Sequence, residues 1–283
     1  MHEREPSKTA FAAAAHRAAH QVLEHGRIFA DPLAVRILGL DPDVIGGQAS
    51  ALAASRGMRL FIAARSACAE RILSESVEAR GVRQVVVLGA GLDTLAYRHG
   101  LGDRVRVFEV DHPATQAWKR RRLAEAAIDA PPSLVFAPAD FERQDLADAL
   151  PAAGFDPAQR SFFIWLGVVP YLTRSAITAT LRMIAGLPGG GEVVFDYGEP
   201  PERLSGEVRT RYDERAARVA AMGEPFLTAF DPDALRAELE ALGFQEIEDV
   251  GTAALLERRA GPGSPAAQRP ANGRGHVVHA STP

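Results

Sequence analysis

The chain has 283 residues, 47% of them hydrophobic and 24% charged, so it is long enough to bury the core of one large domain or two small ones. Its 32 Lys and Arg residues nearly balance 36 Asp and Glu residues and leave a net charge of −4, which argues against nucleic acid or an anionic membrane as a partner. The single cysteine, Cys68, excludes an intramolecular disulfide and a cysteine-based zinc cluster.

Targeting and membrane segments are not expected. No apolar run approaches the roughly 20 residues that a membrane-spanning helix needs. The alanine run from Ala10 to Ala15 is interrupted by His16, Arg17 and His20 before a signal-peptide core can form. We therefore expect a cytoplasmic protein without membrane contact.

The first 80 residues are predicted to form a helical cap. The Asp31-Pro32 pair places proline at the first position of a helix, where its missing N–H is not needed. Glycines at Gly26 and Gly46-Gly47 separate the segments. The predicted helices are Thr9 to His25, Leu33 to Leu38, and about Ala49 to Ala79.

From Arg83 the pattern changes to short apolar runs that alternate with helical stretches, which is typical of a parallel sheet with crossover helices. This predicts an α/β fold with a doubly wound sheet. Strands are expected at Gln84 to Leu88, Val105 to Val110, Leu134 to Ala137, Ser161 to Leu166 and Glu192 to Asp196. Helices are expected at Asp93 to His99, Pro113 to Ile128, Asp145 to Leu150 and Arg174 to Leu187.

The C-terminal third predicts two more helices, Glu202 to Ala221 and Pro232 to Leu242, followed by two apolar runs. These runs, Phe244 to Val250 and Ala253 to Arg258, are separated by only two residues and are expected to form an antiparallel hairpin. A mostly parallel sheet completed by such a hairpin is typical of class I methyltransferases. We expect an α/β domain over residues 81–260 with a substrate-side insert over 197–230, and a disordered Pro- and Gly-rich tail over 261–283.

The end of the first predicted strand is the most informative segment. Gly89-Ala90-Gly91 follows a buried strand, where glycines let the backbone approach a ligand closely. These glycines match the start of a dinucleotide fingerprint, but Thr94 stands where that fingerprint needs a third small residue. This segment alone is compatible both with a purely structural turn and with an NAD site.

Carboxylates follow the next two strands. Asp111 lies twenty residues after Gly91, where it can accept hydrogen bonds from both ribose hydroxyls; alternatively, Glu109 or Asp111 caps the helix that begins at Pro113. Asp140 and Phe141, after the third strand, can bind an adenine amine and pack beside the ring. Because the carboxyl ends of parallel strands meet at one crevice, these residues predict an adenosine pocket.

Three ordered motifs resemble one protein family. They are the segment from Val87 to Thr94 with Tyr97-Arg98, the segment from Phe108 to Pro113, and the segment from Trp165 to Thr173. Together with Gly223-Glu224-Pro225-Phe226 they resemble the leucine carboxyl methyltransferase family, in particular a bacterial branch described as polyketide-type O-methyltransferases. The likeness extends from about Thr9 to Arg258. It implies a class I methyltransferase sheet and S-adenosylmethionine as the cofactor.

The resemblance also implies site residues. Arg65 would pair with the methionine carboxylate, the Gly89-Ala90-Gly91 turn would approach the methionine part, and Asp111 would bind the ribose. Asp140 and Phe141 would bind the adenine. The chain departs from the eukaryotic pattern at Leu166, where those enzymes carry a glutamate, and this weakens any transfer of their protein-phosphatase substrate.

No catalytic base is assigned. Methyl transfer from a sulfonium needs alignment more than acid–base chemistry, and a carboxylate acceptor needs no base. For a phenol or alcohol, Tyr171 and His112 are weak candidates, with a structural turn and a loop cap as the alternatives. His16 and His20 are spaced by four residues but lack a third metal ligand, so no metal site is expected.

The acceptor is expected between the N-terminal helices, the Pro170-Tyr171 turn and the insert from Tyr197 to Phe226, because the first three strand ends are assigned to the cofactor. Aromatic surface is expected from Tyr197, Tyr212, Phe226, Phe11, Phe29 and Phe61. The leading interpretation is an S-adenosylmethionine-dependent O-methyltransferase that acts on a carboxyl or hydroxyl group of a small molecule, for example a polyketide-type metabolite. An NAD-linked oxidoreductase and a non-catalytic nucleoside-binding regulatory protein are the alternatives.

Overall fold

A seven-stranded sheet forms the centre of the computed structural model, which describes residues 7–47, 56–140, 144, 146–260 and 275–283. The strand order is β3-β2-β1-β4-β5-β7-β6, with β1 to β5 parallel and β7 antiparallel to both of its neighbours. This confirms the predicted fold class. The strands are β1 (Gln84–Leu88), β2 (Arg106–Asp111), β3 (Leu134–Pro138), β4 (Ser161–Trp165), β5 (Gly191–Gly198), β6 (Glu246–Gly251) and β7 (Gly275–Ser281).

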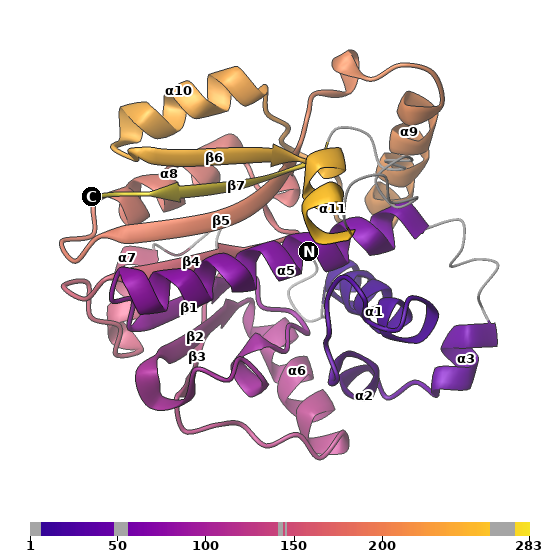
Figure 1. Ribbon diagram of the computed structural model, residues 1–283, viewed down its shortest axis with the longest axis horizontal. Coiled ribbons are helices and arrows are strands. Elements are labelled where there is room, and N and C mark those ends of the chain that lie inside the picture. The colour runs from indigo at the N-terminus through magenta and orange to yellow at the C-terminus, as the bar shows by residue number, and fades with distance from the viewer. Residues whose placement is uncertain (1–6, 48–55, 141–143, 145, 261–274) are drawn as a thin grey trace.

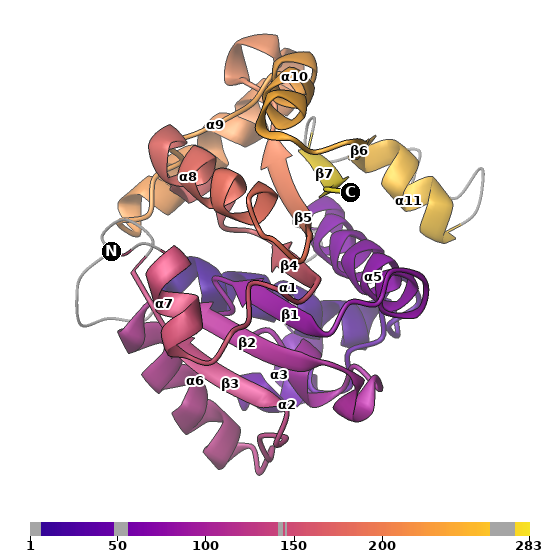
Figure 2. The same cartoon turned by 90° about the vertical axis from the view of Figure 1, so that its left-hand side faces the viewer.

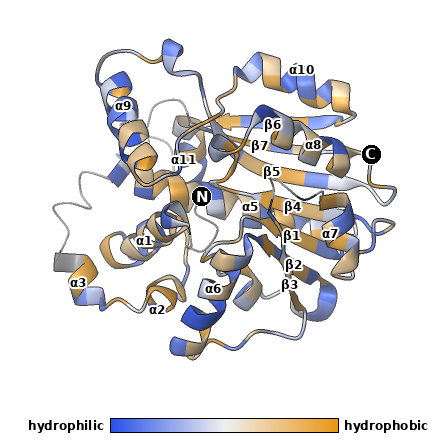
Figure 3. Ribbon diagram, turned by 180° about the vertical axis from the view of Figure 1, so that it is seen from behind, coloured by the Kyte–Doolittle hydropathy of each residue, from blue (hydrophilic) through white to orange (hydrophobic). Residues whose placement is uncertain are grey.

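Helices cover both faces of this sheet (Figure 2). Helices α5 (Arg56–Ala79) and α11 (Thr252–Ala260) cover one face, and α7 (Leu146–Ala152), α8 (Arg174–Ala185) and α10 (Pro232–Leu242) cover the other. Strand β1 shows why both faces must be covered: Val85 and Val87 pack into the α5 side, while Val86 and Leu88 pack into the α8 side. The central strands are accordingly apolar, whereas the outer helices mix polar and apolar residues (Figure 3).

The N-terminal helices lie at the carboxyl edge of the parallel strands (Figure 1). They are α1 (Lys8–Leu23), α2 (Ala34–Leu38) and α3 (Pro42–Gly47), and α1 packs on α2, α3 and α5. Helix α6 (Pro113–Glu125) contacts α2 and β3, and α9 (Gly206–Ala221) lies above α1 in Figure 1. The predicted helical cap is therefore present, and it faces the end of the sheet where ligands bind in this architecture.

Two local predictions are wrong. The segment Asp93 to His99 forms only a single 3-10 turn at Leu95–Tyr97 instead of a helix. The run from Ala253 to Arg258, expected as a strand, is part of helix α11. Its alanine, leucine, glutamate and arginine residues are all strong helix formers, and Leu255 and Leu256 bury one face of the helix against α5.

The prediction of a disordered tail over residues 261–283 is also wrong for residues 275–281. Gly275–Ser281 forms β7, which pairs with β5 on one side and β6 on the other. Val277, Val278 and Ala280 are almost completely buried there, so tertiary burial outweighs the Pro- and Gly-rich composition of the preceding segment. Residues 261–274 lie outside the described part of the chain. The second strand of the antiparallel part is thus β7 and not residues 253–258.

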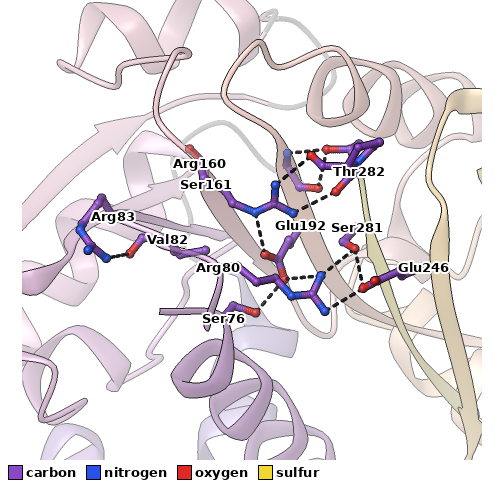
Figure 4. Close-up of polar contacts among 12 residues, drawn as sticks. Ser76, Arg80, Val82, Arg83, Arg160, Ser161, Glu192, Glu246, Ser281 and Thr282 are labelled. Carbon is purple, nitrogen blue, oxygen red and sulfur yellow. Dashed lines mark hydrogen bonds and ion pairs between the residues drawn. The ribbon is translucent and has the colours of Figure 1, made fainter. Parts of the chain in front are cut away.

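A buried carboxylate ties β7 to the rest of the sheet (Figure 4). Glu192 of β5 is fully buried and accepts hydrogen bonds from the Ser76 hydroxyl at 2.7 Å and from Arg160 Nε at 3.2 Å. Arg160 also donates to the carbonyl oxygens of Thr282 and Pro283, both at 2.9 Å. Because α5, β4, β5 and the residues after β7 share this network, the end of the described chain is held at the amino edge of the parallel strands.

Candidate functional site

A cavity of about 480 Å³ lies at the carboxyl ends of β1, β2 and β4. Its size is within the range of small-molecule sites. Its walls come from α1, α5, the turns after β1 to β4 and the loop after α9. The structure brings most of the predicted site residues to this one place: Arg65, Gly89, Ala90, Gly91, Asp111, His112, Asp140 and Tyr171.

The glycine turn after β1 forms the floor of the cavity. Gly89 and Gly91 both have positive φ angles, +65° and +44°, which side chains with a Cβ adopt only with strain. A Cβ on Gly89 would lie 2.4 Å from Val168 Cγ2, and one on Gly91 would lie 3.0 Å from Ala10 Cβ. Glycine is therefore required both by the turn and by the close approach of α1.

Asp111 holds this turn from the end of β2. Its Oδ2 accepts a hydrogen bond from the Gly91 N–H at 2.6 Å, and its Oδ1 accepts one from the His112 N–H at 2.7 Å. Burial raises the pKa of Asp111 above its ordinary value, although the two backbone donors oppose the shift. Each carboxylate oxygen still has a second acceptor position, so the side chain retains the capacity to bind two hydroxyl groups.

Helix α6 is capped by His112 and not by Glu109 or Asp111, the two residues considered from the sequence. His112 is the N-cap of α6, and its Nδ1 accepts a hydrogen bond from the Ala114 N–H at 3.2 Å. Glu109 instead points into the interior, where its carboxylate lies 2.7 Å from Lys119 Nζ, and both side chains are 1% exposed. Neither Glu109 nor Asp111 caps the helix, which leaves Asp111 available to the cavity.

Asp140 lies on the cavity wall after β3, and its backbone N–H donates to Gln144 Oε1 at 2.9 Å. Phe141, predicted to pack beside the adenine, lies outside the described residues. The position of Asp140 fits the predicted crevice, since β3 ends beside β2 and Pro138 pairs with Asp111 in the sheet.

Arg65 reaches the cavity from α5 but already has a protein partner. Its Nη1 lies 2.6 Å from Asp196 Oδ2, and the other oxygen of Asp196 accepts the Gly167 N–H at 2.6 Å. The Arg65 Nε atom is buried without a hydrogen-bond partner in the described structure. The guanidinium is therefore oriented by Asp196 and retains donor capacity beside the glycine turn after β4.

Three further charged residues line the cavity and were not assigned from the sequence: Arg17, Asp93 and Glu224. Arg17 of α1 donates from Nη2 to the Leu92 carbonyl at 2.5 Å and lies 3.3 Å from Asp31 Oδ2. The sequence did contain a signal for Arg17. The spacing of Ala10, Ala13 and Arg17 places two small residues and one cation on a single side of a helix.

Another of these unassigned residues is Glu224, in the loop after α9. Its carboxylate accepts hydrogen bonds from the backbone N–H groups of Lys8 at 3.0 Å and Thr9 at 3.1 Å. The hydroxyl groups of Ser7 and Thr9 also donate to it. A carboxylate at a helix N-terminus is favourable because it satisfies free N–H groups and opposes the helix dipole. We call this set of contacts the α1 latch, since it joins the N-terminal cap to the loop after α9 across the cavity wall.

Each weak candidate for a base has a structural constraint that opposes this role. Burial raises the pKa of Tyr171, so its phenol stays protonated. The Nδ1 of His112 accepts from Ala114, which in the neutral ring leaves Nε2 carrying the proton. Tyr171 therefore fits the alternative of a packed turn, and His112 fits the alternative of a cap.

The aromatic residues expected at the acceptor site are placed differently. None of the six predicted aromatic residues lines the described cavity. Tyr171, which is not one of the six, does line it. Tyr197 points away to donate to Asp249, and Phe29 packs under Arg98. Phe226 packs on Tyr171 with ring centres 5.3 Å apart, and Tyr212 packs behind Phe226 at 5.9 Å.

Within the described residues, no group of three or more His, Cys, Asp or Glu side chains is arranged to hold a metal ion. A search of the same residues for helices long and apolar enough to cross a membrane also finds none.

Comparison with known proteins places the chain in a family. Residues 10–185 match the family model described as leucine carboxyl methyltransferase. The chain belongs to this family. A protein of Bacillus subtilis named "Putative S-adenosyl-L-methionine-dependent methyltransferase YktD" is 35% identical over 182 residues, which cover 64% of this chain and 59% of that protein. One of the same description from Mycobacterium avium is 31% identical over 213 residues, covering 75% and 66%. The chain thus matches about three-fifths to two-thirds of the length of these relatives.

Solved structures support the fold. The chain superimposes on a crystal structure described as a methyltransferase from Thermobifida fusca, with TM-score 0.62, 17% identity and coverage of 99% of this chain and 96% of that one. A DUF574 family protein from Streptomyces avermitilis gives TM-score 0.56 at 16% identity, covering 95% and 97%. These two structures therefore share the overall fold of this chain.

Proposed function

We propose that the protein is a methyltransferase that binds S-adenosylmethionine in the cavity at the carboxyl ends of β1, β2 and β4. The observation that supports this most directly is the contact of Asp111 with the Gly91 N–H at 2.6 Å, beside the cavity. It places an acidic side chain with spare acceptor positions directly over a tight glycine turn, which is the arrangement that nucleoside sites of this sheet use.

The other residues fit the remaining parts of the cofactor. Asp140 would accept from the adenine amine, while Arg65 and Arg17 offer guanidinium groups to the methionine carboxylate. Bound S-adenosylmethionine supplies an activated methyl group. The chain itself would orient the acceptor and exclude water, for which α1 and the loop after α9 form the wall opposite the sheet.

We infer further that the acceptor atom is an oxygen of a small molecule, a polyketide-type metabolite being one example. Methyl transfer to a carboxylate needs no base; burial raises the pKa of Tyr171, and His112 Nδ1 already accepts the Ala114 N–H. A hydroxyl acceptor would have to be ionised before it binds.

Isothermal titration of the full chain with S-adenosylmethionine, S-adenosylhomocysteine and NAD tests the cofactor assignment. We expect both sulfur nucleosides to bind and NAD not to bind; binding of NAD alone would contradict the proposal and favour an oxidoreductase. Transfer of a labelled methyl group from S-adenosylmethionine to any acceptor in a metabolite extract would separate an enzyme from a regulatory protein that only binds the nucleoside.

A further inference from the structure

Arg215 of α9 forms no ion pair with any residue that the structure describes. Its side chain is partly buried, its Nε atom is fully buried without a hydrogen-bond partner, and its Nη1 lies 3.9 Å from Met58 Sδ. Among the described carboxylates, Asp196 attracts Arg215 electrostatically, but its ion-pair partner is Arg65 at 2.6 Å. By contrast, Arg209 and Arg211 of the same helix each contact an acidic side chain four residues away at 2.9 Å.

Arg215 packs on aromatic side chains beside the cavity, next to residues that line it. Its Cζ lies 5.1 Å from the centre of the Phe226 ring and 6.0 Å from that of Tyr212. Phe226 in turn packs on Tyr171, which lines the cavity. Pro225 and Leu227, on either side of Phe226, also line it. The guanidinium therefore lies at the edge of the wall that we assign to the acceptor.

The surroundings of Arg215 favour an anion. Burial lowers the pKa of Arg215, although Asp196 opposes the shift; since a guanidinium stays charged at any physiological pH, its desolvation is only partly compensated. Cation–π contacts with Phe226 and Tyr212 offset only part of that cost.

We propose that Arg215 binds an anionic group of the methyl acceptor, with the body of the acceptor against Tyr171, and that it selects organic carboxylates over their neutral analogues. This inference rests on the proposed methyltransferase function and adds a substrate class to it. The planar guanidinium fork matches a carboxylate. The bound group serves recognition and is distinct from the methylated oxygen, because an oxygen held by a guanidinium is a weaker nucleophile.

Calorimetry with defined probes tests the assignment. The wild-type chain, saturated with S-adenosylhomocysteine and also without it, is titrated with 4-hydroxybenzoate, phenyl phosphate and the neutral 4-hydroxybenzamide. We expect 4-hydroxybenzoate to bind at least about tenfold more tightly than the amide, as a charge-assisted hydrogen bond allows. Tighter binding of phenyl phosphate would assign the site to a phosphate instead of a carboxylate. Equal affinity for the acid and the amide, or no binding of either anion, would overturn the proposal.

Two variants separate recognition from structure. Arg215→Met keeps the apolar stem next to Met58 and should lose the preference for the acid while leaving the affinity for the amide unchanged. Arg211→Met, which removes an exposed and ion-paired arginine of the same helix, should leave that preference intact. Removal of a cation whose desolvation is only partly compensated should also leave the thermal midpoint unchanged or raised, whereas removal of a purely structural arginine would lower it.

The two proposals fail in different ways. If S-adenosylhomocysteine does not bind, the methyltransferase function fails, whatever the anion titrations give. If it binds and Arg215→Met still prefers the acid, only the role of Arg215 is wrong.

Discussion

Single residues at the cavity combine structural and binding roles, and Asp111 is the clearest example. It fixes the glycine turn through Gly91 and faces the cavity at the same time. A substitution there therefore removes acceptors for the ligand and loosens the turn that the ligand contacts.

We expect Asp111→Asn to weaken S-adenosylhomocysteine about 10- to 100-fold, the range for loss of charge-assisted hydrogen bonds. Titration calorimetry measures this directly. Asp103→Asn, which changes an exposed carboxylate near the start of β2, is the matched control and should bind normally. Unchanged affinity of Asp111→Asn would remove this residue from the site.

His16 gives the protein a pH dependence of known sign. Its folded-state pKa is lowered to about 4, so the unfolded chain binds the proton first as the pH falls below about 6.5. The free energy of unfolding should therefore decrease between pH 6.5 and pH 4, by at most about 1.4 kcal/mol per pH unit from this group.

Denaturant titrations of wild type and His16→Gln over pH 4 to 6.5 check this prediction. The variant should show a shallower slope, whereas His25→Asn, at an exposed position with positive φ, should match the wild type. Parallel slopes for wild type and His16→Gln would show that His16 does not titrate abnormally.

At the level of elements, α1 depends on its latch. Because Glu224 satisfies the free N–H groups of Lys8 and Thr9, the first turn of α1 is coupled to the loop after α9. The cavity wall therefore closes only when both elements are in place.

We expect Glu224→Gln to loosen this turn. Loss of the charged acceptor should increase amide hydrogen exchange at Lys8 and Thr9 about tenfold, as expected for a weakened cap. It should also speed the release of S-adenosylhomocysteine. Glu214→Gln, on the exposed side of α9, is the control. If exchange at α1 were the same in both variants, the latch would not hold the helix.

The sequence predicted those elements whose local signals agree with their packing. The parallel strands were found from apolar runs, and α10 was predicted with the bounds that the structure shows, Pro232–Leu242. Helix α11 was misassigned because a short apolar run does not distinguish a buried strand from a helix. The site was predicted where residues follow strand ends. Glu224 and Arg215 could not be found this way, since their roles depend on contacts with segments far away in the sequence.

For the whole molecule, β7 is the element that completes the sheet. It was missed because its burial comes entirely from β5 and β6, whereas the composition before it suggests disorder. The composition of a segment does not show whether two other strands leave a position between them in the sheet for it to pair.

Deletion of residues 275–283 should prevent folding, because it removes two ladders of the sheet and leaves Glu192 and Arg160 without part of their network. We expect loss of the cooperative thermal transition and exposure of apolar surface detected with a hydrophobic dye. Deletion of Pro283 alone keeps both ladders and should unfold cooperatively. A cooperative transition for the longer deletion would show that β7 is dispensable.

The position of β7 also determines the order in which the protein can assemble during translation. Strand β6 is made before β7, but among the described strands its backbone pairs only with β7. The ribosome must therefore release Gly275–Ser281 before β6 can dock, and until then β5 presents an open, apolar edge to other chains. Slow synthesis of Gly275–Ser281 should expose nascent chains to aggregation, and a chaperone that covers the edge of β5 should raise the yield.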